Sequence, residues 1–142
     1  MDGIESILAD FKRLKENCEK LDGQTIRVGI VGAADSEVLT IARAHEYGVP
    51  GKLPERSFIR ASFDANKDEL CQLTDSQVTK VISGKTSAEA AANAVGAQAA
   101  QMVQGYIDDN RVTPPSDYSK KRVSVTLYET GTHIRDRISW EV

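Results

Sequence analysis

The spacing of apolar residues predicts an amphipathic helix over residues 3–21. Apolar side chains recur there every three or four positions, so they share one face of a helix: Ile4, Ile7, Leu8, Phe11, Leu14, Cys18 and Leu21. Gly23 is suited to end this helix. Because Cys18 belongs to the apolar stripe, we expect it to pack in the core rather than to act as a nucleophile.

A strand and a second helix follow. Ile26, Val28 and Ile30 alternate with polar or small residues, which predicts a strand over residues 24–32 with one buried face. Asp35 or Ser36 is suited to cap a helix that continues to Tyr47 and ends at Gly48.

Two longer helices are predicted in the middle of the chain. The first covers residues 62–83, where Thr74–Ser76 is a candidate interruption. The second covers residues 87–109, and Thr86 with Glu89 has the spacing of a capping box. Its many alanines favour helix formation and allow another element to approach closely.

Extended loops are predicted over residues 49–60 and 111–122, where prolines interrupt regular structure. Between the second loop and the C-terminus, alternation predicts a strand around residues 123–127, a turn at 130–132 and a final strand over 138–142. We expect the first and last strands to pair. The prediction is therefore one α+β domain over residues 1–142, with a small antiparallel sheet flanked by helices.

Composition sets limits on function. The chain has 142 residues, 40% hydrophobic and 27% charged, and a net charge of −3. Strong nucleic-acid binding normally requires a basic protein or a basic stripe, which makes it improbable here. We expect no membrane span and no signal peptide, and two widely spaced cysteines favour a cytoplasmic protein with free thiols over one with a Cys18–Cys71 bridge.

Two stretches resemble catalytic motifs, but each lacks a residue that the motif requires. The stretch 83–86 imitates the end of a phosphate-binding loop, but Thr79 stands where that loop requires glycine. His45-Glu46 imitates a zinc-protease motif, but Val49 stands where the second histidine is required. We therefore expect no catalytic site, no metal and no cofactor.

Three separated stretches carry a resemblance to a known family. They are residues 41–60, with His45-Glu46-Tyr47-Gly48 and Pro54-Glu55-Arg56-Ser57-Phe58-Ile59-Arg60, then an alanine-rich helix followed by Pro114-Pro115, and finally Tyr128-Glu129-Thr130-Gly131 with the end of the chain. In this order they resemble the neck and tail-completion proteins of tailed double-stranded-DNA phages, such as the G-type virion-morphogenesis protein of Mu-like phages. Arg137 departs from the serine usual in that family. The resemblance covers residues 24–142.

The resemblance implies a non-catalytic virion protein, assembled in the host cytoplasm, at the neck or the head-proximal end of the tail. It implies a homo-oligomeric ring around the DNA channel, which we expect to be hexameric, with other neck, connector or tail-tube proteins as partners and at most weak contact with duplex DNA. The expected interface residues are Pro54, Arg56, Phe58, Arg60, Pro114 and Pro115. Expected contacts with DNA in the channel are Lys52, Lys120, Lys121 and Arg122. Expected structural motif residues are His45, Glu46, Gly48, Thr130, Gly131 and Trp140.

Two alternatives stay open. Phe58 either anchors an arm on a neighbouring subunit or belongs to this subunit's own core. The whole protein is either a virion component or a small intracellular adaptor or regulator, which would bind a protein partner through its amphipathic N-terminal helix.

Overall fold

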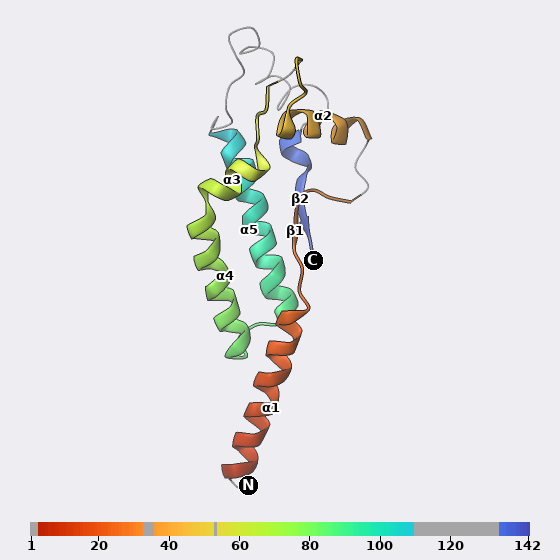
Figure 1. The fold of residues 1–142 in the computed structure, drawn as a ribbon. Helices are drawn as coiled ribbons and strands as arrows, with labels where there is room; N and C mark the ends of the chain where they lie inside the picture. The colour runs from red at the N-terminus through yellow and green to blue at the C-terminus, as the bar shows by residue number, and fades with distance from the viewer. Residues whose placement is uncertain (1–2, 33–35, 53, 110–133) are drawn as a thin grey trace.

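The computed structural model describes residues 3–32, 36–52, 54–109 and 134–142, which form a mostly helical α+β fold (Figure 1). This confirms the expected fold class. The elements are α1 (Gly3–Asp22), β1 (Arg27–Ile30), α2 (Ser36–Tyr47), α3 (Ile59–Ala65), α4 (Lys67–Ile82), α5 (Ala88–Asp108), the 3₁₀ helix η1 (Ile134–Arg137) and β2 (Ile138–Glu141). The predicted loop 111–122, the strand near 123–127 and the turn 130–132 lie outside the described residues.

The first and last strands pair, as the sequence predicts. β1 and β2 run antiparallel, with Val28 opposite Trp140 and Ile30 opposite Ile138. β1 is shorter than the predicted strand over 24–32. Pairing the two ends of the domain in this way brings both strands onto one side of α5.

Helix α5 lies at the centre of the core and contributes residues to both of its buried clusters. Its N-cap is Ser87, whose hydroxyl accepts a hydrogen bond from the Ala90 amide at 3.1 Å, rather than the predicted Thr86. Its small residues admit close neighbours. A methyl group added at Gly96 would lie 2.5 Å from Cδ1 of Trp140, and the Trp140 indole donates to Asn93 Oδ1 at 3.1 Å. β2 therefore approaches α5 more closely than any larger side chain at Gly96 would permit.

The predicted helix over 62–83 is wrong in its boundaries. It is two helices, α3 and α4, which are separated at Asn66 rather than at Thr74–Ser76. The Asn66 side chain donates to the Ser62 carbonyl at 2.8 Å, which satisfies an acceptor at the end of α3 and favours a break there. Thr74 stays helical, and its hydroxyl donates back to the Leu70 carbonyl at 2.8 Å.

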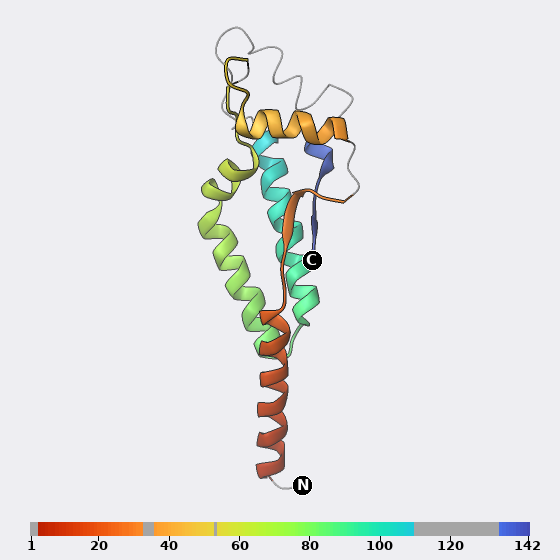
Figure 2. The ribbon, with the colours of Figure 1, turned by 45° about the vertical axis from the view of Figure 1, so that its right-hand side comes forward.

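Helices α1 and α2 sit at opposite ends of the molecule. α2 lies crosswise over the end of α5, while α1 projects away from the rest of the chain (Figures 1 and 2). α1 has no buried residue. The expectation that Cys18 packs in the core is therefore wrong, since Cys18 and Cys71 are both exposed free thiols. Periodicity identified the apolar face of α1 correctly, but the fold of this subunit does not cover that face.

Candidate assembly interface

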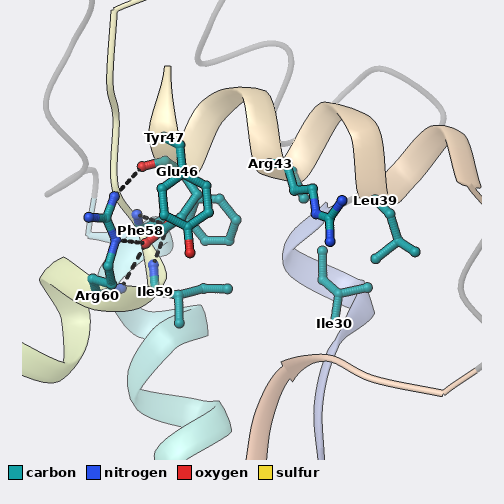
Figure 3. A pocket seen from close by; sticks show the side chains of 9 residues that line it. Ile30, Leu39, Arg43, Glu46, Tyr47, Phe58, Ile59 and Arg60 are labelled. Carbon is teal, nitrogen blue, oxygen red and sulfur yellow. Dashed lines mark hydrogen bonds and ion pairs between the residues drawn. The ribbon is translucent and has the colours of Figure 1, made fainter. Parts of the chain in front are cut away.

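Glu46 connects the two parts of the 41–60 stretch, because its side chain caps helix α3. Its carboxylate accepts hydrogen bonds from the backbone amides of Phe58, Ile59 and Arg60 at 2.9, 3.0 and 3.0 Å (Figure 3). These amides belong to the first turn of α3, where no carbonyl of the helix can reach them. A negative charge at this end of a helix is also favoured by the helix dipole.

Ser57 completes the cap. Its hydroxyl donates to Glu46 Oε1 at 2.8 Å and accepts from the Ala61 amide at 3.0 Å. All four backbone amides at the start of α3 therefore have acceptors, three on the Glu46 carboxylate and one on Ser57.

Arg60 closes the network from the solvent side. Its guanidinium donates to Glu46 Oε1 at 2.9 Å, to the Glu46 carbonyl at 2.6 Å and to Glu55 at 2.7 Å. It also lies over the Tyr47 ring, 4.6 Å from the ring centre. Arg60 was expected at an interface with a neighbour or with DNA, but in this subunit it is engaged with the end of α2. Its hydrogen bond to Glu46 is the largest factor that raises the pKa of its guanidinium.

The cap decides the charge state of Glu46. Burial alone would raise the pKa of its carboxyl, but the amide hydrogen bonds and Arg60 outweigh burial, so the pKa is lowered. Glu46 is therefore ionised at neutral pH. Because it already accepts five hydrogen bonds, it is poorly placed to abstract a proton from a substrate.

His45 and Arg56 lie buried beside the cap, with 3% of each exposed. Burial, with a smaller contribution from the Arg56 charge, lowers the pKa of His45 to about 4, so the ring is neutral at pH 7. Its Nδ1 atom has no hydrogen-bond partner among the described residues. The Arg56 amide donates to the His45 carbonyl at 2.8 Å and ties the loop to the end of α2. Burial also lowers the pKa of Arg56.

Two of the four interface candidates in the first loop are therefore inside the subunit. Phe58 is fully buried in the core formed with Val103, Ile107 and Ile134, so the second alternative for it holds. The expectation that Arg56 faces a neighbour or DNA is wrong, because the loop folds back and buries it. Pro54 and Lys52 are exposed.

Of the remaining candidate residues, some lie in the described part of the chain and others do not. Gly48 adopts a positive φ of 74°, which suits it to end α2. Pro114, Pro115, Lys120, Lys121, Arg122, Thr130 and Gly131 lie outside the described residues.

A small cavity of about 230 Å³ opens beside the cap, between α2 and the start of α3. Leu39, Arg43 and Tyr47 form one side of it and Ile30 and Ile59 the other (Figure 3). Within the described residues, no group of three His, Cys, Asp or Glu side chains is placed to hold a metal ion.

Within the described part of the chain, a row of large apolar side chains stands exposed on α1. We call it the α1 stripe and define it as Ile4, Ile7, Leu8, Phe11 and Leu14, which are 64%, 57%, 62%, 65% and 36% exposed. The stripe lies on the part of α1 that projects from the molecule (Figure 2). Soluble monomers rarely leave so many large apolar side chains together in water, and such surfaces commonly mark sites of protein association.

A second uncovered apolar surface is a groove between α4 and β1, with α5 as its floor. Two adjoining cavities of about 180 and 360 Å³ form it, and Ile26, Thr74 and Val95 line both. We call it the α4–β1 groove. Its other lining residues are Leu21, Gln24, Gln77, Val78, Ala88, Ala91 and Ala92 at one end and Val28, Phe63, Leu70 and Ala99 at the other. Every lining side chain is uncharged.

Sequence reasoning missed both the cap and the groove. The capping glutamate and the helix it caps are more than ten residues apart, and the groove combines three elements. Comparison with protein-family models, curated proteins and solved structures finds no match for this chain. Among the described residues, no helix combines the length and apolar character that crossing a bilayer requires.

Proposed function

We propose that the protein is a structural subunit of a tailed double-stranded-DNA phage virion, located at the neck or the head-proximal end of the tail. In this proposal, copies of the chain assemble as a ring around the DNA channel. The motifs in residues 41–60 and at the end of the chain occur in the same order as in neck and tail-completion proteins, and this resemblance supports the proposed class of protein.

The single observation that carries the assembly part of the proposal is the uncovered α1 stripe. Four of its five side chains are more than half exposed. Burying one large apolar side chain is worth about 1.5–3 kcal/mol, so a subunit with this surface gains substantially from association. A subunit whose apolar surface is left for a neighbour fits an assembly component better than it fits an independent monomer.

The contents of the cap region favour a structural role over catalysis. Glu46 and Arg60 hold α2, the loop and α3 together through hydrogen bonds within the chain. A rigid connection of this kind suits a subunit that has no catalytic role and must keep its shape in an assembly. The net charge of −3 suits a channel through which DNA slides without being held.

The alternative is a small intracellular adaptor or regulator. The same α1 stripe favours it, because an exposed amphipathic helix is a common element for binding a partner protein. An adaptor of this kind predicts a soluble dimer that never enters virions.

Electron microscopy of a lysate separates the two functions. The gene is disrupted in the phage genome, and a plasmid copy serves as the control that restores it. Filled heads and finished tails lying apart place the protein at head–tail joining, while abnormally long tails place it at the end of the tail tube. Normal infectious particles would overturn the virion proposal and favour the adaptor.

A further inference from the structure

We propose that the α1 stripe of one copy docks in the α4–β1 groove of the next copy. This inference rests on the proposed ring and names the contact that builds it. It pairs two apolar surfaces that the described part of the subunit leaves uncovered, one on a projecting helix and one in a hollow.

The stripe is held away from its own groove. The Asn17 side chain donates to the Val81 carbonyl at 3.1 Å, and Leu21 packs against Val81, Ala88 and Ala91. These contacts fix the C-terminal end of α1 against α4 and α5 and direct the rest of the helix outward (Figures 1 and 2). At a rise of 1.5 Å per residue, Ile4 lies about 20 Å beyond Asn17. The stripe therefore cannot reach the groove of its own subunit, and we assign its cover to a second copy of the chain.

The groove has the chemistry and the size to accept the stripe. Its lining has no charge, so it offers nothing to a phosphate or to a charged peptide. A dry protein cavity of about 150 Å³ accommodates benzene, so either cavity has room for the Phe11 ring. The alanines of α5 in the floor let an incoming helix approach closely. Charged residues of α1 such as Lys12 and Glu16 lie off the stripe and stay in water.

The geometry of the contact suits a ring. Stripe and groove are different surfaces, so each subunit offers one to each of two neighbours, and such head-to-tail contacts form a ring when the rotation from one copy to the next closes. The competing arrangement is a symmetric pair of α1 helices, because Ile4, Ile7, Phe11 and Leu14 follow the alternating three-and-four spacing of a coiled-coil seam. That pairing would leave the groove of both partners open to water, whereas docking covers both surfaces at once.

The test uses four variants of the whole chain and native mass spectrometry. Phe11→Asp places a charge on the stripe, and Thr74→Arg places one in the groove. Ala9→Asp is the matched control, because it adds the same charge to the opposite face of α1. Gln77→Arg is a second groove variant at a position that lines the same groove. Circular dichroism and Trp140 fluorescence check that each variant is folded.

We expect rings for the wild type and Ala9→Asp, and monomers for Phe11→Asp and for both groove variants. The protein concentration needed for assembly should rise roughly 30-fold or more in each disrupted variant, as for a central interface residue. Mixing Phe11→Asp with Thr74→Arg should yield one-to-one heterodimers and no ring, because the mixture contains one intact stripe and one intact groove per pair.

Several results would overturn the docking. Rings that persist in Phe11→Asp would show that another surface builds them, and the proposed virion function would stand. Loss of assembly in Phe11→Asp alone, with both groove variants unaffected and no heterodimer on mixing, would indicate symmetric pairing of α1. A monomeric wild type would exclude self-docking, while the lysate experiment would still decide the function independently.

Discussion

Replacing Glu46 with glutamine tests whether this carboxylate holds the 41–60 region together. The substitution preserves the shape of the side chain but converts one carboxylate oxygen into an NH₂ group. Glu46 Oε2 accepts from the Phe58 and Ile59 amides, and Oε1 accepts from Ser57 and from two donors of Arg60. Whichever oxygen is replaced, at least two N–H groups then face a donor instead of an acceptor.

The size of the effect follows from those two groups. A buried donor left without an acceptor costs about 1–3 kcal/mol. Phe58 is fully buried and Glu46 is 5% exposed, so water cannot easily replace the lost acceptor. The Arg60 guanidinium is half-exposed and recovers hydration, so we assign its lost ion pair little weight. Glutamine can keep its oxygen on the Phe58 and Ile59 amides, which leaves the part-buried Arg60 amide without an acceptor, so we expect the free energy of unfolding to fall by about 1–3 kcal/mol.

Urea unfolding followed by circular dichroism measures this change, at one protein concentration because the proposed assembly would also stabilise the fold. Glu55→Gln is the matched control. It removes the other carboxylate that pairs with Arg60, but Glu55 is 56% exposed, so its loss should cost less than about 1 kcal/mol. If Glu46→Gln and Glu55→Gln unfold at the same urea concentration, the capping argument is wrong.

Two further predictions concern acid stability and the contact between α5 and β2. Stability should fall as the pH drops from 6.5 to about 4, because the unfolded state protonates His45 while the buried ring stays neutral. His45 contributes about 3 kcal/mol to this loss, and that contribution should be absent in His45→Leu when unfolding is measured across this range. Gly96→Ala should destabilise the fold by roughly 1–3 kcal/mol and shift the fluorescence of the single tryptophan, since the new methyl group collides with Trp140. Unchanged stability and emission would contradict that close contact.

The sequence predicted those helices and strands that are determined by residues close together in the chain. The stripes of α1 and α5, the breaker at Gly48 and the alternation of β1 and β2 are all written in neighbouring residues, and these elements formed close to the predicted positions. The small residues of α5 indicated close packing, which Gly96 against Trp140 confirms. Even the pairing of the first and last strands followed, since the described chain has these two strands and each has one apolar face.

Contacts between distant residues account for what the sequence did not predict. Helix α3 begins at Ile59 because Glu46, from another helix, supplies the acceptors for its first amides. No periodicity near residue 59 contains that information. The same fold-back buries Phe58 and Arg56, which local reasoning placed on an arm. Periodicity likewise identified the apolar face of α1 but not what covers it, so Cys18 was wrongly expected in the core.

The two motifs of the 41–60 stretch thus stabilise the subunit itself, so the proposed assembly would draw its free energy from another surface. The hydrogen-bonding groups of Glu46 and the ring of Phe58 are already satisfied within the chain. Withdrawing them to contact a neighbour would expose the amides of α3 and open the core, which costs more than a loop contact returns. The α1 stripe has no such cost, because in the isolated subunit its side chains are already in water. The proposed association through α1 would therefore gain the burial of apolar surface without disrupting the subunit, as expected of a building block that folds first and assembles afterwards.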